Sequence, residues 1–463
     1  MRILAFDRAR YARETRATVK LALPLIAGQL SSIGMNAVDV VLAGHYNAHT
    51  LASVAVGANV WLLALVCAIG VMMALPPSVA HLDGAGAKHE IGPLFRQALM
   101  LAATLGVLLW FGVRHAGPLL RVLGVDAELL PDVQAFLHAL SWGAPAVCFY
   151  YSLRGLSEGM SWTRPTMFFG FTGLCALAPM GYVLIYGKLG LPALGAQGSG
   201  IANAIVLWLQ VIAFATYVRL SPRYRELHLF ARFERPDLRA IAGLLHIGVP
   251  MGVTLLMEAG MFSIAALLIS RFGTTAAAAH QIAINFASIT FMVPLGLALA
   301  ITVRVGNAAG RNDPAGVRYA GFGGIALTFV TQALASSLML GIPLWIARLY
   351  TDAPAVMALA AHLLMLAGAF QFADGIQVAS NGALRGLKDT RLPMFITVLA
   401  YWGIGMPVGY MLAFHAGWRT PGMWVGLSAG LYAAALLLSA RFTRLARNGT
   451  WKRSHAVAPS LTP

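Results

Sequence analysis

The chain has little charge and almost no cysteine. Of its 463 residues, 11% are charged and three are cysteine, whereas 59% are apolar, and the mean hydropathy is +0.72. A balance this apolar excludes an ordinary soluble domain. Cys67, Cys148 and Cys175 are widely spaced inside apolar runs, which favours a packing role over a disulfide framework or a metal site.

Several runs without any charge are long enough to cross a membrane. Residues 51–80, 189–218 and 319–347 each exceed the roughly 20 residues that span the hydrocarbon core as a helix. Strand-like alternation is absent, which excludes a membrane β-barrel. Charged and Gly/Pro-rich breaks divide the chain into twelve predicted helices: 18–42, 49–78, 94–114, 128–153, 165–187, 195–219, 240–270, 276–304, 318–346, 353–383, 392–414 and 421–441.

The basic residues predict the orientation, because Lys and Arg near helix ends stay on the cytoplasmic side. With both termini cytoplasmic, 27 of the 33 basic residues lie on that side. The segments 2–20, 219–239 and 441–453 then flank the membrane, where they can contact anionic lipid, and we expect no nucleic-acid partner. The first twenty residues are basic and polar, so we expect no removable signal peptide. The six outer basic residues are Arg114, Arg121, Lys188, Arg271, Arg348 and Arg419.

Three acidic residues interrupt the apolar runs. Asp39, Glu258 and Asp374 each lie inside a predicted membrane helix, where a carboxylate costs at least about 3 kcal/mol unless it meets a partner, water or a proton. Such residues indicate an ion or substrate pathway, and the alternative for each is a structural hydrogen bond to a neighbouring helix. Three further acids at predicted cytoplasmic helix ends are expected to be solvated: Asp83, Glu158 and Asp389.

The second half of the chain repeats the first. Pro24 and Pro250 are equivalent, and LAGHYNAHTLASVAVGANV aligns without gaps to LISRFGTTAAAAHQIAINF at the same offset of 226. Six helices per half make the repeats parallel, so we expect two six-helix lobes related by a pseudo-twofold axis along the membrane normal. The predicted parts are an N-terminal segment (1–17), an N-lobe (18–219), a basic linker (220–239), a C-lobe (240–441) and a basic tail (442–463).

Four long motifs carry a family resemblance. They are MNAVDVVLAGHYNAHTLASVAVGANVW, MMALPPSVAHLDGAG, MEAGMFSIAALLISRFG and FQFADGIQVASNGALRGLKDTRLP. In order and topology the chain resembles the multidrug and toxic compound extrusion (MATE) family, in its NorM-like bacterial branch. The resemblance covers nearly the whole chain.

The resemblance implies a secondary active efflux transporter in a bacterial inner membrane. Inward movement of H⁺ or Na⁺ would drive outward movement of cationic amphipathic drugs and dyes by alternating access, without ATP or a cofactor. By motif position, Asp39, Glu258 and Asp374 match the family's ion-coupling acids of helices one, seven and ten. We expect small cationic molecules and membrane lipid as partners, and a monomer.

Two departures from the family bear on the coupling ion. Some members place a tyrosine one turn before the helix-ten acid for a Na⁺ site, and here that residue is Phe370. Others use asparagines beside the helix-five proline, and here the flanking positions are Leu177 and Gly181. Because Na⁺ needs several oxygen ligands, these losses favour protons, with Na⁺ at Glu258 and Asp374 as the alternative.

Residues on the same helical faces predict the cavity wall. Aromatic and Met side chains beside a carboxylate form an adaptable, cation-attracting surface, although each also suits ordinary packing. For the polar residues of the predicted helix 276–304, polar packing is the alternative. The predicted cavity residues are Asn36, Met261, Phe262, His280, Gln281, Asn285, Phe370 and Gln377.

Two other functions are the alternatives to a drug transporter. A flippase or exporter of a lipid-linked or metabolite substrate would share the architecture, but it should place Arg or Lys in the cavity for an anionic head group, and helices one and seven have none at mid-membrane. An enzyme would need a catalytic constellation at one membrane face. Gly155-x-Ser157-x-Gly159 fits a nucleophile elbow but lacks the strand-turn-helix context, so we expect no enzyme.

Overall fold

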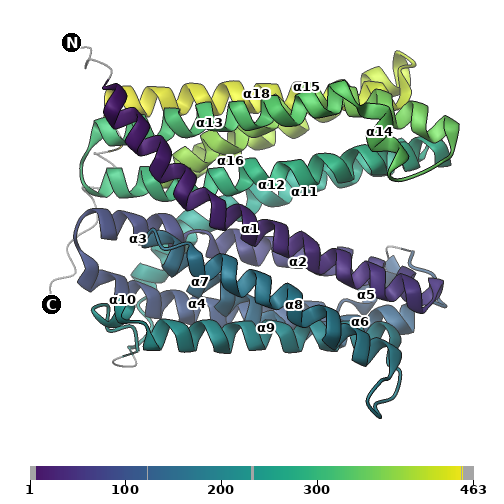
Figure 1. Cartoon of the computed structure of the whole chain (residues 1–463), viewed down its shortest axis with the longest axis horizontal. Helices are drawn as coiled ribbons and strands as arrows, with labels where there is room; N and C mark the ends of the chain where they lie inside the picture. Colours follow the sequence, from purple (N-terminus) through teal and green to yellow (C-terminus); the bar gives the residue numbers. More distant parts are fainter. Residues whose placement is uncertain (1–6, 123, 231–233, 450, 452–463) are drawn as a thin grey trace. The chain divides into compact units, whose positions relative to one another are not determined.

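The computed structural model describes residues 7–122, 124–230, 234–449 and 451. Every regular element in these ranges is a helix, as the sequence predicted (Figure 1). The elements are α1 (Arg8–Tyr46), α2 (Ala48–Met72), α3 (Leu75–Gly84), α4 (Lys88–Arg114), α5 (Gly117–Val122), α6 (Leu130–Ser141), α7 (Ala144–Gly159), α8 (Arg164–Tyr186), α9 (Gly195–Leu220), α10 (Pro222–Arg225), α11 (Leu238–Ser270), α12 (Thr274–Gly310), α13 (Pro314–Gly341), α14 (Pro343–Arg348), α15 (Pro354–Gly386), α16 (Arg391–Val398), η1 (Leu399–Gly405), α17 (Met406–Tyr410), η2 (Met411–His415) and α18 (Arg419–Asn448).

All twelve predicted spans fall on helices. In the described part of the chain, eleven helical segments are long and apolar enough to cross a membrane, counting Ala48–Gly84 and Arg391–His415 as one segment each. The twelfth predicted span, 128–153, is formed by α6 and α7, which meet at Trp142 and Gly143. The chain is therefore an all-α polytopic membrane protein.

Proline explains three breaks that the predicted spans missed. Helix α3 carries Pro76 in its first turn, α7 carries Pro145, and α14 begins at Pro343. Proline suits the first turn of a helix, where its missing N–H is not needed, and it disfavours helical geometry in the preceding residue. The predicted spans 49–78, 128–153 and 318–346 are therefore each divided in two.

The span before α18 contains two π-helical segments, η1 and η2. It packs closely on α18 through glycines. A Cβ added to Gly426 would lie 2.1 Å from the Cα of Gly409, and one added to Gly405 would lie 3.2 Å from the Cα of Gly430. Small residues at such contacts let two membrane helices approach to backbone contact, so side chains on the other faces of η1 are positioned precisely.

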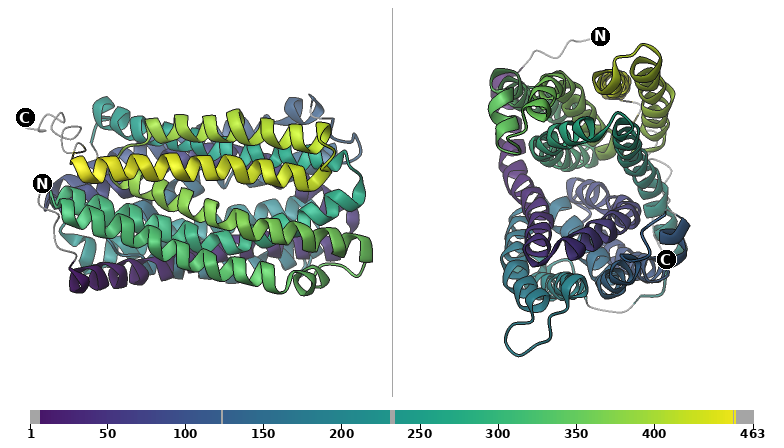
Figure 2. Two further views of the ribbon diagram at one scale, coloured as in Figure 1. Left: turned by 90° about the horizontal axis from the view of Figure 1, so that it is seen from above. Right: turned by 90° about the vertical axis from the view of Figure 1, so that its right-hand side faces the viewer.

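The contacts between Cα atoms define two compact units. Unit 2 comprises residues 27–253, and unit 1 comprises the described residues up to Ile26 together with those from Thr254 onward. Within unit 1, α15 packs against α12, α13 and α18, which run side by side (Figure 2). The chain passes between the units inside α1 and α11, just after Pro24 and Pro250. The lobes defined by the sequence repeat stay a prediction.

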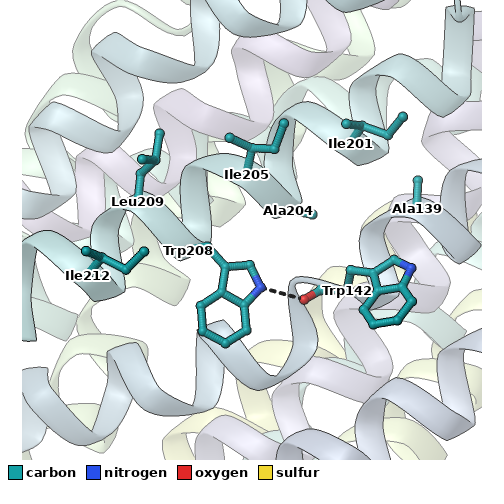
Figure 3. Close-up of a pocket in the computed structure, with 8 residues that line it drawn as sticks. All are labelled: Ala139, Trp142, Ile201, Ala204, Ile205, Trp208, Leu209 and Ile212. Atoms are coloured by element: carbon teal, nitrogen blue, oxygen red, sulfur yellow. Dashed lines mark hydrogen bonds between the residues drawn. The ribbon is translucent and has the colours of Figure 1, made fainter.

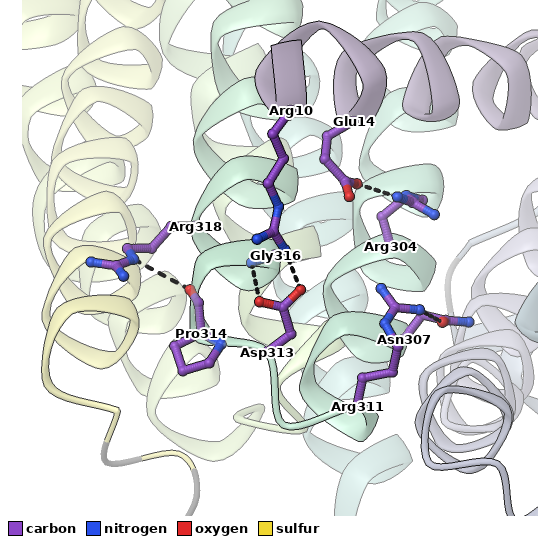
Figure 4. Close-up of polar contacts among 9 residues, drawn as sticks. All are labelled: Arg10, Glu14, Arg304, Asn307, Arg311, Asp313, Pro314, Gly316 and Arg318. Atoms are coloured by element: carbon purple, nitrogen blue, oxygen red, sulfur yellow. Dashed lines mark hydrogen bonds and ion pairs between the residues drawn. The ribbon is translucent and has the colours of Figure 1, made fainter. Parts of the chain in front are cut away.

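Charged side chains bind the first turns of α1 to the ends of α12 and α13 in unit 1 (Figure 4). Arg10 forms an ion pair with Asp313, and Glu14 forms one with Arg304. Asp313 also caps α13, because its Oδ1 accepts a hydrogen bond of 2.9 Å from the N–H of Gly316. These contacts extend α1 and α12 beyond the predicted membrane spans.

The predicted linker packs against α4 and α7 of unit 2. Arg96 donates to the carbonyl of His228 at 2.8 Å and pairs with Glu234 at 2.5 Å. Tyr224 is buried, and its hydroxyl lies 2.9 Å from the Ser157 hydroxyl. The described part of the linker is therefore bound to the helices of unit 2 by polar contacts.

Candidate functional site

In unit 2, Asp39 of α1 is bonded to α9. Its Oδ1 accepts hydrogen bonds from the Ser199 hydroxyl and the Asn203 amide, both at 2.9 Å, and its Oδ2 accepts from the same amide at 2.8 Å. Ser199 and Asn203 are one turn apart on α9 and so present their donors on one face. The sequence analysis missed both, because nothing in the sequence pairs the first helix with this one.

The side of α8 that faces Asp39's helix is apolar. Leu177 is fully buried with Leu184, Ala202 and Val206, and the residues packed around them include Val38 of α1. A Cβ on Gly181 would lie 2.8 Å from a methyl group of Leu42. The two positions where other family members carry asparagine therefore contribute no side-chain oxygen here.

In unit 1, Asp374 of α15 is only 5% exposed, and its Oδ1 has no hydrogen-bond partner in the described chain. A buried carboxyl oxygen without a donor is costly, so each case calls for an explanation. In native proteins a proton, an ion or an ordered water satisfies such an oxygen. Asp374 is therefore a candidate ligand-binding group in unit 1.

Other unsatisfied polar atoms belong to residues near Asp374. Gln377, one turn along α15, is 1% exposed and leaves both its Nε2 and Oε1 without partners among the described residues. Three more buried polar atoms have no hydrogen-bond partner among the described residues: the Tyr401 hydroxyl, the His280 Nδ1 and the Trp424 Nε1. They come from η1, α12 and α18, so four helices supply unpaired polar groups to the interior of unit 1.

Aromatic rings form a continuous wall around this region. Phe370 lies one turn before Asp374, and its ring centroid is 6.0 Å from that of Phe262 and 5.7 Å from that of Trp424. The His280 ring is 5.7 Å from Trp424, and Met261 is fully buried. Five of the predicted cavity residues, Met261, Phe262, His280, Phe370 and Gln377, therefore belong to the interior of unit 1 around Asp374.

Glu258 of α11 differs from Asp374 in its electrostatic surroundings. The Arg385 guanidinium, 6% exposed in the last turn of α15, attracts the Glu258 carboxylate. The charged group that acts on Asp374 is Glu258, which repels it. Glu258 is thus attracted by a cation, whereas Asp374 is repelled by a like charge.

Tyr401 was not predicted as a site residue. It is fully buried, and its hydroxyl lies within electrostatic range of both Glu258 and Asp374. The next residue fixes its helix: the Trp402 indole donates to the carbonyl of Met257 at 3.2 Å. A tyrosine within an apolar run gives no sequence signal, and the π-helical turn that positions it has none either.

Three predicted cavity residues lie elsewhere. Asn36, Gln281 and Asn285 are exposed, and the Asn285 side chain accepts a hydrogen bond of 3.0 Å from the Tyr350 hydroxyl. None of them joins the buried polar atoms of unit 1. Their role in a cavity stays a prediction.

The expectation that Glu158 is solvated was wrong. It is 3% exposed, and its Oε1 accepts hydrogen bonds from Arg154 at 2.5 Å and Thr166 at 3.3 Å. Arg154 also donates to Gln29 at 2.8 Å. The i, i+4 spacing places both charges on one helical face, and together they can be buried where either alone would be expensive.

Long apolar helices that carry carboxylates within membrane-length segments are typical of a polytopic membrane transport protein. A family model described as MatE matches residues 24–183 and 250–411. The chain therefore belongs to the MatE family. The two matched segments correspond to the two halves of the sequence repeat.

Full-length relatives agree with this assignment. The chain is 51% identical over 441 residues to a probable multidrug resistance protein NorM of Xanthomonas campestris pv. campestris, covering 95% of this chain and 96% of that one. It is 39% identical over 446 residues to the multidrug resistance protein PmpM of Pseudomonas aeruginosa, covering 95% and 93%.

Solved structures share the fold. The eukaryotic MATE transporter AtDTX14 matches with a TM-score of 0.86 at 20% identity, over 96% of this chain and 99% of that one. A MATE family transporter in an outward-facing conformation matches with a TM-score of 0.87 at 17% identity, over 95% and 97%. At these identities the likeness concerns the arrangement of helices.

Proposed function

We propose that this protein is a secondary active multidrug efflux transporter of a bacterial inner membrane. It exchanges H⁺ moving inward for cationic amphipathic compounds moving outward. The named relatives are multidrug resistance proteins, which supports the substrate class. The mechanism rests on the carboxylates of unit 1.

The observation that carries the proposal is the unpartnered Oδ1 of Asp374 at 5% exposure. At bilayer depth a carboxylate is strongly disfavoured unless it is protonated, paired with a cation or hydrated. A proton and a cationic substrate satisfy the same oxygen, so they are alternative ligands. Competition for one group couples the two movements without ATP.

The two acids have different tasks in this scheme. Arg385 places a positive charge near Glu258, which favours the charged form of that acid against the cost of its burial. Asp374 faces the repulsion of Glu258 and gains most from taking up a proton or a cation. Asp374 is accordingly the principal proton-exchanging group, and Glu258 adds negative charge that draws cations to the site.

Aromatic neighbours explain how varied cations are accepted. The ring centroid of Phe370 lies 6.0 Å from that of Phe262 and 5.7 Å from that of Trp424. Such faces attract cations, and Met261 adds a soft, adaptable surface. The site therefore recognises charge and apolar bulk rather than one arrangement of hydrogen bonds.

Alternating access requires the two units to move against each other. Both connecting helices, α1 and α11, contain a proline just before the point where the contacts change from one unit to the other. Proline removes one backbone hydrogen bond from a helix and weakens it locally. Pro24 and Pro250 are therefore the positions at which α1 and α11 bend as the units move.

Protons fit the ligand set better than Na⁺. The departures at Phe370, Leu177 and Gly181 each remove an oxygen that a Na⁺ site would use. Tyr401 and Gln377 restore two neutral oxygens near Asp374, so a Na⁺ site at Glu258 and Asp374 is the defined competitor. A proton needs only the carboxylate itself.

Export of an anionic lipid-linked compound is the second candidate, and the charge of the site disfavours it. Two carboxylates and one guanidinium interact in the interior of unit 1. When both acids are ionised, the two carboxylates outnumber the one guanidinium and the site is negative. A negative site repels an anionic head group.

Efflux of a fluorescent cationic dye from proteoliposomes decides the coupling ion. A pH gradient at constant Na⁺ should drive dye transport, and a Na⁺ gradient at constant pH should leave it at the level of empty liposomes. If the Na⁺ gradient alone drives transport, the ion is Na⁺. If neither gradient does so while the dye binds, the antiport proposal fails.

A further inference from the structure

A groove in unit 2 lies between α6 and α9. Its volume is about 330 Å³ (Figure 3). The residues that line it are Ala139, Trp142, Ile201, Ala204, Ile205, Trp208, Leu209 and Ile212. None of these side chains carries a charge, and the two indoles are its only polar groups.

Large apolar side chains in the groove are exposed rather than packed. Trp142 is 58% exposed, Leu209 is 48% exposed and Ile212 is 59% exposed. The Trp208 indole donates to the backbone carbonyl of Trp142 at 2.9 Å, which holds the Trp208 side chain at the groove (Figure 3). From Ile201 to Ile212 the groove follows roughly 16 Å of helix, about half the hydrocarbon thickness of a bilayer.

A cation lies beside the groove at the end of α4. The Arg114 guanidinium is 5.6 Å from the centre of the Trp110 ring and 6.0 Å from that of Trp142, which lines the groove. No acidic side chain in the described ranges forms an ion pair with Arg114. The Trp110 indole N–H is buried and has no hydrogen-bond partner among the described residues.

The carbonyl of Arg114 is bonded to α6, because the His138 Nε2 lies 2.9 Å from it. This contact fixes the end of α4 one turn from Trp142 along α6. The charge is therefore attached to the same rigid surface as the groove. An apolar groove about one leaflet deep fits an acyl chain, and a positive charge beside it fits the phosphate of a phospholipid.

We propose that the groove between α6 and α9 binds an acyl chain of an anionic membrane phospholipid whose phosphate is held at Arg114. The charge selects the phosphate-bearing anionic head group, and the groove takes up one chain. Bound lipid would replace the bilayer as the packing partner of Trp142 and Trp208. The site is distinct from the carboxylates of unit 1.

Native mass spectrometry of the detergent-solubilised full chain tests this with phosphatidylglycerol and phosphatidylcholine as probes. We expect the wild type to retain phosphatidylglycerol in preference, and Arg114→Gln to lose about fivefold of that preference, as expected for one basic residue near a membrane surface. Arg348→Gln, which removes another predicted outer charge, should retain it.

A second variant separates the groove from the charge. Ile205→Trp fills the groove and should lower retention of both lipids, whereas Leu436→Trp, at a 70% exposed position of α18, should not. Equal retention by wild type, Arg114→Gln and Ile205→Trp would overturn the proposal. A dimer that disappears in Ile205→Trp would also overturn it, because a second copy would then occupy the groove.

Discussion

The indole N–H of Trp402 donates a hydrogen bond of 3.2 Å to the backbone carbonyl of Met257, the residue before Glu258. This bond fixes the π-helical segment η1 against the turn of α11 that carries the acid. Tyr401, the neighbour of Trp402, is thereby directed into unit 1, where it is fully buried. Because of this hydrogen bond, Tyr401 belongs to the same site as Glu258.

Tyr401→Phe should lower dye efflux about five- to tenfold, because it removes a hydroxyl that interacts with the charged or ligand-bound site and keeps the ring. Removing an unused buried hydroxyl would instead leave transport unchanged. Tyr410→Phe, at a 42% exposed tyrosine of α17, is the matched control. Initial rates in proteoliposomes with matched protein content give the comparison.

Asp374→Asn and Glu258→Gln should each reduce efflux to the level of empty liposomes. Both substitutions keep the size of the side chain and remove one negative charge from the site, so membrane insertion and protein level should match the wild type. Asp352→Asn, an exposed acid in the loop before α15, should transport normally. Wild-type efflux in either site variant would remove that residue from the mechanism.

The three hydrogen bonds on Asp39 allow its structural and ion-coupling roles to be separated. Asp39→Asn should reduce transport, and the exchange Asp39→Asn with Asn203→Asp restores one carboxylate and one amide between α1 and α9. We expect the exchange to recover thermal stability but not efflux, because the carboxylate then sits on the wrong helix. Recovery of efflux would show that Asp39 is only a structural partner.

The buried pair of Arg154 and Glu158 should be asymmetric under mutation. Arg154→Ala leaves an uncompensated buried carboxylate and should cost about 3–5 kcal/mol of stability. The double variant Arg154→Met with Glu158→Leu removes both charges and should cost clearly less. Thermal unfolding in detergent measures the order, and equal losses in the two variants would contradict this account of Glu158.

Lys388, in the loop after α15, provides a pH-dependent test outside the membrane spans. Burial lowers its pKa from 10.5 to about 8. In the unfolded chain the Lys388 ammonium stays charged up to about pH 10.5. Burying this charge therefore lowers the free energy of unfolding by its full amount below about pH 8. The loss of stability disappears as the pH rises toward 10.5.

Lys388→Met should therefore be more stable than the wild type at pH 7, by ~1–2 kcal/mol. The difference should narrow as the pH is raised through 9 and 10. Thermal unfolding of both proteins across this range checks the sign. A difference that stays constant with pH would show that the ammonium is solvated.

The spans were predictable because uncharged runs of membrane length leave few alternatives. The breaks at Pro76, Pro145 and Pro343 were harder to predict, since Pro24 and Pro250 lie inside continuous helices and a proline alone does not mark a new first turn. Glu158 was misjudged although Arg154, four residues earlier, signalled a partner on the same face. The burial of one acid depends on a neighbour of opposite charge, which its position at a helix end does not show.

The candidate site was predictable only in part. Asp374, Phe370 and Gln377 share a helical face, so periodicity placed them together. Tyr401 and Asn203 reach their partners through contacts between helices far apart in the sequence, and periodicity along one helix says nothing of such contacts.

Proton release on substrate binding tests the central claim most directly. A cationic dye added to the purified protein in weakly buffered solution should release a proton into the medium as it binds, because dye and proton compete for Asp374. Asp374→Asn should bind the dye, if at all, without proton release. Binding to the wild type with no change in pH, or equal release from Asp374→Asn, would contradict the account.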